Sequence, residues 1–415
     1  MAIISLGNIN KYFIFALLGG ISKSVAGTLL YIFTNELKKY PFMLGANAGF
    51  GMSLSIIPYI IIALNNRGTK NQSIVVNEKL VLNRQYYENY NEKKLRLKKF
   101  LILLLCGFLD FFQKVLVFLF SYSIDNNVWI FNILFLNVFS ICILKTKLYK
   151  HQLISSSIMI AMGIILNIII LFGMPANKIP ALLLSIFIET IYSLCIVVSK
   201  YGMEHGFCSP LEISFYEGVF AFVINVIFLS IATNVPISEN SSFIGYLKST
   251  IYKEKIYLDN FFAYFAVFRG KEIIMFIITM LSRWIFNLFT LIALKHYTPS
   301  HVIFLLIIGE SQNAFFDIDL TWKRIVAIVI YCFLLILLLI FTEIIILNFW
   351  GLDKDTRDKI AFRAKFTESG DLTDCIEEDS SERKSNTEIE IEKGIQINLT
   401  KTGDEKLLPD TKVNN

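Results

Sequence analysis

The chain has 415 residues, of which 55% are hydrophobic and only 18% are charged, with a formal net charge of +5 at pH 7. This composition is too apolar for a protein whose whole surface faces water, so it predicts a membrane protein. The basic residues lie in loops between apolar stretches and form no single stripe, which argues against nucleic acid as a partner.

Ten apolar stretches have about the length that a helix needs to cross a bilayer, roughly 20 residues. We therefore predict an all-α membrane protein with ten transmembrane helices. The first stretch resembles a signal peptide, but a lysine stands at its centre and no clear small-residue cleavage site follows, so we expect it to be retained. The predicted spans are residues 12–33, 41–64, 100–122, 128–144, 153–172, 179–198, 213–231, 273–293, 302–316 and 325–347.

The spans divide into two sets of five, so we predict two inverted five-helix repeats, residues 1–172 and 173–348, followed by a tail at 349–415. The fourth and ninth spans are the shortest, and they hold corresponding positions in the two halves. Short spans at such positions indicate where a transporter binds its substrate.

The loops predict the orientation of the protein. Lys and Arg are about twice as frequent on one side, which places both termini in the cytosol. The basic loop 65–99 is then cytosolic, where it either meets anionic lipid headgroups or serves as an ordinary positive flank. Loop 233–272 is lumenal, and its alternation of aromatic and basic residues predicts short interfacial helices.

The tail is acidic and lacks apolar periodicity beyond about Thr367, so we expect it to be disordered. Near its end, Asp404, Leu407 and Leu408 form a pattern like the acidic-dileucine signals that sorting adaptors read. Short patterns of this kind also occur by chance. If the pattern is used, it is an endosomal or lysosomal address.

Several spans carry an ionisable residue at mid-depth. A charge in hydrocarbon is costly, and it usually faces the interior of the bundle or a water-filled cavity that handles a solute. Together with an asparagine in span eight, these residues are our candidates for binding or gating a substrate: Lys23, Asp110, Lys114, Glu189, Glu217, Arg283, Asn287 and Glu310.

Two of these charges are four residues apart in span three. Asp110 and Lys114 share one helix face with the acid N-terminal, which is the favourable order. They are either a neutralising pair that lets the helix insert or a substrate and proton site. Arg283 is always charged at mid-span, so it needs a counter-ion such as Glu310 or Glu189, or an anionic substrate.

Two candidates have equally plausible structural explanations. Glu217 follows a polar run and lies either in the cavity or near the cytosolic mouth, where reaching water is cheap. Glu310 stands in the polar sequence GESQN at 309–313, which either interrupts span nine at a substrate site or ends the span.

Four segments resemble the drug/metabolite transporter superfamily, and within it the F-type members of solute carrier family 35 and chloroquine-resistance transporters. They are Leu109-Asp110 in span three, LFLNVFSICILKTKLYKHQL at 134–153, Pro210-Leu211 followed by SFYEGVFAF at 214–222, and Phe286-Asn287 followed by YTPS at 297–300. The resemblance covers most of residues 10–348.

The resemblance implies an EamA-like bundle of inverted halves, alternating access and residence in an internal membrane of a eukaryotic cell, such as a Golgi, endosomal, lysosomal or vacuolar membrane. One departure bears on the ligand. Relatives often carry a basic residue early in span four, whereas residues 128–137 offer only Asn132 and Asn137. The relatives' ligand is therefore not transferred to this chain.

These observations predict a secondary transporter of a small polar metabolite, with spans one to four and six to nine around a cavity. The mixed charges suggest a zwitterionic or anionic substrate, or proton-coupled exchange, and spans five and ten are expected outside as a support or homodimer contact. We expect no cofactor and no metal, since the four histidines are scattered and no CxxC pair exists. The alternatives are a scaffold or sorting protein acting through its loop and tail, and, last, an intramembrane enzyme.

Overall fold

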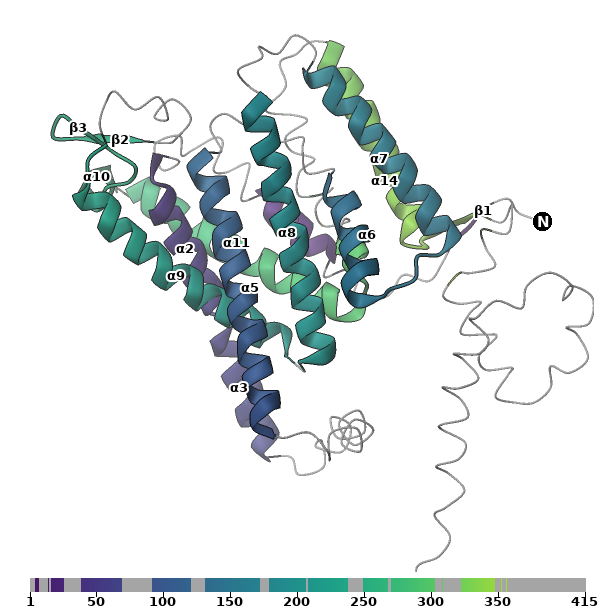
Figure 1. Cartoon of the computed structure of the whole chain (residues 1–415), viewed down its shortest axis with the longest axis horizontal. Helices are drawn as coiled ribbons and strands as arrows, with labels where there is room; N and C mark the ends of the chain where they lie inside the picture. The colour runs from purple at the N-terminus through teal and green to yellow at the C-terminus, as the bar shows by residue number, and fades with distance from the viewer. Residues whose placement is uncertain are drawn as a thin grey trace, which may run out of the picture. The chain divides into compact units, whose positions relative to one another are not determined.

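The structure is a computed structural model in which a bundle of long helices is accompanied by two short two-stranded sheets (Figure 1). All the elements lie in the first of two units, residues 1–355. The structure describes residues 4–6, 14, 16–25, 39–68, 92–120, 131–171, 179–206, 208–237, 249–267, 270–302, 308, 322–347, 352 and 356. Most of the tail, including the dileucine pattern, lies outside these residues.

Six helical stretches are long and apolar enough to cross a membrane: Pro41–Ile62, Arg96–Val117, Lys150–Ile169, Leu182–His205, Pro210–Asn234 and Glu272–His296. Two shorter apolar helices, Phe131–Leu144 and Ile328–Phe341, coincide with predicted spans four and ten. The prediction of a largely helical chain is thus confirmed, and the six helices are compatible with a multi-pass membrane protein. Half of span one, residues 14 and 16–25, is described and is helical, whereas most of span nine falls outside the described residues.

The helices that carry the bundle are α2 (Pro41–Ser53), α3 (Ile56–Gly68), α5 (Glu92–Phe120), α6 (Phe131–Leu144), α7 (Lys150–Leu171), α8 (Ile179–His205), α9 (Pro210–Asn234), α11 (Gly270–His296) and α14 (Trp322–Phe341). Local sequence explains the start of α9. Ser209 accepts a hydrogen bond from the Glu212 amide, the Glu212 side chain accepts one from the Ser209 amide, and Pro210 occupies the first turn.

Two predicted spans differ in their details. Span two is broken into α2 and α3 around Ser55. Span ten was predicted to run to residue 347, but α14 ends at Phe341, and Glu343 then adopts a positive φ of 63°. Such a conformation stops a helix because an L residue cannot continue one from it. Hydrophobicity alone does not predict that the helix ends at Phe341.

The structure is mostly helical, as the all-α prediction expects, and it adds four short strands that the sequence did not predict. Strand β1 (Ile4–Leu6) pairs antiparallel with β4 (Ile345–Leu347), and β2 (Thr250–Tyr252) pairs with β3 (Lys255–Tyr257). The predicted interfacial helices of loop 233–272 are represented by one short helix, α10 (Phe261–Val267), beside the β2–β3 hairpin. Lys253 and Glu254 provide the positive-φ turn of this hairpin.

Helices α2 and α9 make the most extensive contact in the bundle. Glycines allow this approach: a Cβ on Gly49 would lie 2.5 Å from the Phe222 amide nitrogen, and a Cβ on Gly218 would collide with the backbone at Ser53. Small residues let helix backbones touch in a membrane, where water does not drive helices together. The α2–α9 pair therefore forms the centre of the described bundle.

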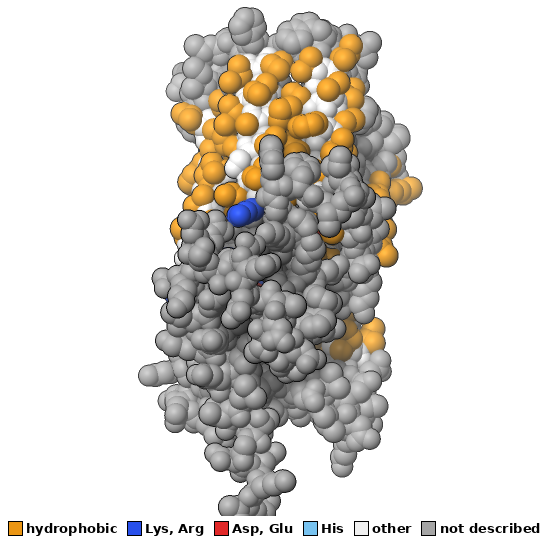
Figure 2. Space-filling model, turned by 90° about the vertical axis from the view of Figure 1, so that its right-hand side faces the viewer, with side chains coloured by type: hydrophobic (Ala, Val, Ile, Leu, Met, Phe, Trp, Pro, Cys, Tyr) orange, Lys and Arg blue, Asp and Glu red, His pale blue; other side chains and the backbone are white. Residues whose placement is uncertain are grey.

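Helices α7 and α14 pack side by side at the right of Figure 1. His151 of α7 and Glu343, just after α14, lie 3.2 Å apart across this pair. The face of the molecule on that side carries a broad area of hydrophobic side chains (Figure 2). Exposed side chains of these two helices include Leu153, Ile158, Ile165, Ile325, Val329 and Phe333. Such a surface suits lipid or another apolar partner.

Candidate functional site

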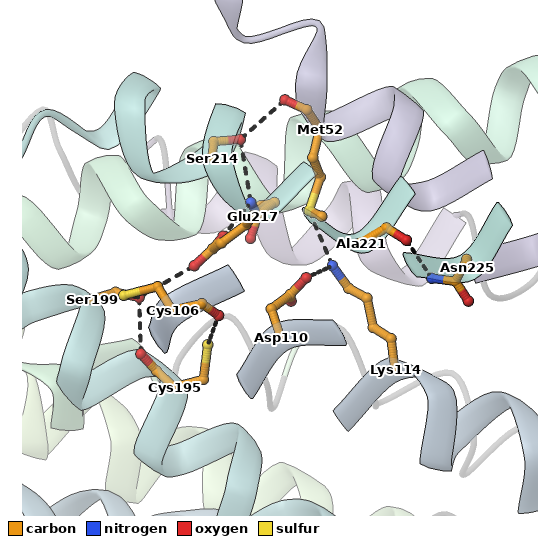
Figure 3. A network of polar contacts seen from close by, with 11 residues as sticks. Met52, Cys106, Asp110, Lys114, Cys195, Ser199, Ser214, Glu217, Ala221 and Asn225 are labelled. Carbon is orange, nitrogen blue, oxygen red and sulfur yellow. Dashed lines mark hydrogen bonds and ion pairs between the residues drawn. The ribbon is translucent and has the colours of Figure 1, made fainter. Parts of the chain in front are cut away.

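The centre of the bundle contains a network of polar side chains around Glu217 (Figure 3). Glu217 of α9 is only 2% exposed. Its Oε1 accepts a hydrogen bond from Ser199 of α8 at 3.3 Å, and its Oε2 accepts one from the Asn287 amide of α11 at 3.1 Å. From the sequence alone, Glu217 was expected either in a cavity or near the cytosolic mouth. The structure buries it where α8, α9 and α11 meet.

An ion pair on α5 belongs to the same network. The Asp110 carboxylate and Lys114 Nζ are 2.6 Å apart, and both side chains are about nine-tenths buried. Lys114 Nζ also lies 3.0 Å from the Met52 sulfur on α2. The i, i+4 pairing predicted from the sequence is therefore present. It does not decide between an insertion pair and a substrate site.

Serines and a tryptophan extend the network toward the break between α2 and α3. Asn287 Nδ2 donates to Ser214 Oγ at 3.3 Å, and Ser55 Oγ donates to the same oxygen at 2.8 Å. Trp284 donates its ring N–H to Ser55 at 2.9 Å. Ser214 also approaches the Met52 carbonyl at 3.5 Å. A continuous set of polar contacts thus joins α2, α9 and α11.

Glu189 lies in a second polar cluster between α6 and α8. Its Oε2 accepts a hydrogen bond from Asn132 Nδ2 at 2.5 Å, and Asn132 Oδ1 accepts one from Ser193 at 2.8 Å. Asn132 is 1% exposed. Asn132 is one of the two asparagines of residues 128–137 noted above, and its amide contacts the carboxylate of span six.

The remaining candidates are described less fully. Lys23 lies over the Phe286 ring of α11, with Nζ 5.4 Å from the ring centroid, and the neighbouring Ser22 donates to the Ser282 carbonyl at 3.0 Å. Arg283 is half-buried on α11. Glu310 and most of span nine lie outside the described residues, so the predicted Arg283–Glu310 contact stays a prediction.

One end of the bundle is held by an ion pair that the sequence did not indicate. Lys99 Nζ, near the start of α5, lies 3.0 Å from both carboxylate oxygens of Glu212 at the start of α9. The Tyr59 hydroxyl of α3 donates to Glu212 at 3.4 Å. Both ion-pair side chains are partly exposed, so the contact is accessible to water. It can form and break at a modest energetic cost.

The opposite end is held by Asp259, between the β2–β3 hairpin and α10. Its Oδ2 accepts hydrogen bonds from the amides of Phe42 and Met43 at 2.7 and 3.0 Å, at the start of α2. It thus caps a helix that has no side-chain cap of its own. Asp259 is fully buried, and burial raises the pKa of its carboxyl group to about 7, against the lowering effect of these amides.

The candidates are connected by small polar residues of the apolar spans, which the sequence did not single out as site residues. Ser55, Asn132, Ser193, Ser199 and Ser214 are all buried and connect the candidates. Within the part of the chain that the structure describes, no group of three or more His, Cys, Asp or Glu side chains is arranged to hold a metal ion. No protein-family model matches the chain, and no curated protein matches it either.

Proposed function

We propose that this protein is a secondary transporter that moves a small polar metabolite across an internal membrane by alternating access. The observation that carries the proposal is the buried network around Glu217, in which α2, α5, α8, α9 and α11 all contribute polar groups. Ionisable side chains inside membrane helices are costly, and they typically mark solute or proton pathways.

The helix contacts support two inverted halves of five spans. A pseudo-twofold axis that relates span n to span n+5 relates span two to span seven and span five to span ten, and related spans can touch each other only where they lie beside the axis. Both pairs are in contact, as α2–α9 and α7–α14. The same axis would relate the α5–α9 contact to the α11–α2 contact, and both are present. This agreement favours the architecture that the resemblance to drug/metabolite transporters implies.

The position of the termini favours an even number of spans. Strand β1 precedes the first predicted span and β4 follows helix α14, yet the two strands are hydrogen-bonded partners. Chain segments that pair in this way lie on one side of a membrane. We propose, from the distribution of basic residues, that this side is the cytosol.

Alternating access needs a closure at each end of the cavity. The Lys99–Glu212 ion pair joins the two proposed halves at one end, and the Asp259 cap of α2 joins them at the other. Both contacts are polar, and the one at the Asp259 end lies beside the buried apolar cluster of Tyr40, Leu44 and Tyr264. Rocking of one half against the other could therefore break one closure while the second remains.

The chemistry of the network bears on the substrate. It offers carboxylates, an ammonium group and amide and hydroxyl groups, which together suit a zwitterionic or anionic metabolite. Glu217 is our candidate for proton coupling, because a buried carboxylate can change its protonation when the substrate arrives. The hydrophobic α7–α14 face is the proposed support or homodimer contact.

Transport is tested by uptake into proteoliposomes. A thermal-shift screen of amino acids, nucleotides, nucleotide sugars, peptides and organic acids first identifies ligands, because a ligand of the folded state raises the apparent stability. Hits are then assayed with Glu217→Gln and, as a control, Glu204→Gln at the exposed end of α8. We expect the first variant to lose uptake and the second to keep it.

Two other results would contradict parts of this proposal. Full uptake by Glu217→Gln would remove this network from the transport mechanism. If no compound class binds and deletion of residues 367–415 abolishes the cellular function, the scaffold or sorting alternative is favoured instead.

A further inference from the structure

A groove separate from the polar network runs along α9 at the end of the bundle that carries α10. It encloses about 520 Å³, within the usual range for small-molecule sites. Helix α2 contributes Met43, Ala46, Asn47 and Phe50, which have the spacing of one helix face. Residues 222, 226, 229, 230 and 233 supply the matching face of α9, and α10 and α11 complete the walls.

The inner part of the groove is apolar and opens to the surface that a membrane would cover. Phe50 of α2 and Phe222 of α9 lie with ring centroids 5.9 Å apart, and both side chains are exposed. Phe261 and Phe262 of α10 form the wall at the other end, and they are exposed as well. Exposed aromatic rings around a concavity favour an apolar molecule that enters from the lipid.

Asn47, one of the residues that line the groove, has a buried side-chain oxygen without a hydrogen-bond partner in the described part of the chain. The Asn47 side chain is 4% exposed, and its amide nitrogen donates to the Phe276 carbonyl at 3.2 Å and to Thr279 Oγ1 at 3.4 Å. These contacts fix the orientation of the amide. Its Oδ1 has no hydrogen-bond partner among the described residues. A buried acceptor of this kind calls for a donor, such as a hydroxyl group.

The outer end of the groove is polar but uncharged. Ser230, Thr233 and Asn234 line it, and no lining residue that the structure describes is ionisable. A helix rises about 1.5 Å per residue, so the α9 wall from Phe222 to Asn234 is about 18 Å long. One leaflet of a bilayer contributes roughly 15 Å of hydrocarbon. The groove is therefore about as long as one leaflet of the bilayer is thick.

We infer that this groove binds an uncharged membrane lipid that carries a hydroxyl group. Its apolar body would lie between α2 and α9 on Phe50, Phe222 and Val226, and its hydroxyl group would donate to Asn47 Oδ1. The absence of ionisable groups among the described lining residues disfavours phospholipids with charged headgroups. Sterols and diacylglycerols share the required chemistry. The site is independent of the transported substrate, since it lies outside the polar network.

The test uses the full chain in phosphatidylcholine nanodiscs with two photoactivatable probes, a cholesterol analogue and a diacylglycerol analogue. Labelled peptides are mapped by mass spectrometry, with unlabelled cholesterol or diacylglycerol as competitor. We expect saturable labelling of α2 or α9 peptides by at least one probe. The unlabelled lipid that reduces the labelling, cholesterol or diacylglycerol, is the one that the groove binds. Labelling that does not saturate for either probe overturns the inference.

A matched pair of variants makes the test specific. Val226→Trp fills the groove, whereas Val223→Trp places the same bulk on an exposed position of the same helix outside it. Losing about 1.4 kcal/mol of binding corresponds to a tenfold weaker affinity, and we expect at least about that loss for Val226→Trp alone. Equal labelling of the two variants overturns the site.

Asn47→Leu tests the hydroxyl contact, because leucine has a similar size and no acceptor. We expect weaker competition by cholesterol or diacylglycerol, and unchanged competition by the corresponding lipid that lacks the hydroxyl group. If Asn47→Leu does not fold, the comparison of hydroxylated and hydroxyl-free competitors on the unaltered protein gives the answer. Equal potency of the two competitors overturns the assignment of the hydroxyl group.

Discussion

Asn287 of α11 donates a hydrogen bond from its side-chain amide to Oε2 of Glu217 of α9 over 3.1 Å. The same amide also reaches Ser214. A single side chain from span eight thus connects to the buried acid and to the serine that faces the α2–α3 break. The orientation of Glu217 is coupled through Asn287 to the packing of α11 against α9.

Replacing Asn287 by leucine should remove this coupling. We expect uptake to fall strongly, while stability falls by about 1 kcal/mol, as is usual for a hydrogen bond between membrane helices. Uptake and thermal midpoint are measured on the same preparation. The control is Asn167→Leu in α7, whose amide donates to the Gly163 carbonyl of its own helix. Similar loss of uptake in both variants would contradict a specific role for Asn287.

The Asp110–Lys114 pair should behave as a unit. Asp110→Leu or Lys114→Met alone leaves a buried charge uncompensated, which typically costs about 3 to 5 kcal/mol, whereas replacing both by apolar residues is often close to neutral. We expect the double variant to regain most of the stability lost by either single variant. Thermal unfolding of all four proteins measures the coupling, and additive effects would argue against a direct pair.

If the double variant is stable, its uptake separates the two interpretations of the pair. A neutralising pair that only assists insertion predicts normal uptake. A substrate or proton site predicts that uptake is lost although the protein is folded.

Gly49→Ala should destabilise the α2–α9 contact. The added Cβ would meet the Phe222 amide nitrogen at 2.5 Å, and backbone cannot move aside as a flexible side chain can. Overpacking of this kind costs about 1 to 3 kcal/mol. Gly270→Ala is the control, since a Cβ there has no atom within 4 Å. A thermal midpoint of Gly49→Ala equal to that of the control would contradict the close approach.

Asp259 should make stability depend on pH. Burial raises the pKa of its carboxyl group to about 7 in the folded state, above the ordinary value of 3.8. The folded protein therefore binds more protons than the unfolded chain between these values, and its stability falls as pH rises through this window, by at most about 1.4 kcal/mol per pH unit. Acidic conditions favour the buried cap.

The measurement is the thermal midpoint of the purified protein between pH 5 and 8, compared with Asp259→Asn. Asparagine keeps an acceptor for the Phe42 and Met43 amides but cannot ionise. The variant should show a flatter pH dependence than the unaltered protein. Parallel curves for the two proteins would show that Asp259 does not titrate in this range.

Hydrophobic length predicted most spans well, because a bilayer demands a long apolar helix whatever the partners are. The pairing of Asp110 with Lys114 was also predictable, since spacing along one helix fixes it. Contacts between distant helices were not predictable from such rules. Asp259 and Phe42 are far apart in the sequence, and no local pattern indicates that one caps the other.

The site illustrates the same limit. Charged residues stand out in an apolar span, so Glu217 and Glu189 were recognised as candidates. Their partners Ser199 and Asn132 did not stand out, because serine and asparagine are common at many helix contacts. Which of them faces a carboxylate depends on the rotation of each helix, and this is set by packing such as that of Gly49 on α9.

The β1–β4 ladder gives the bundle an order of assembly. A chain made from its N-terminus exposes Ile4–Leu6 long before Ile345–Leu347 is synthesised, so this ladder forms only after the last span has been completed. Until then, residues 4–6 lack the partner with which they form the ladder. The ladder is thus a late contact between the two ends of the helical region, and a chain that stops before residue 345 would lack it.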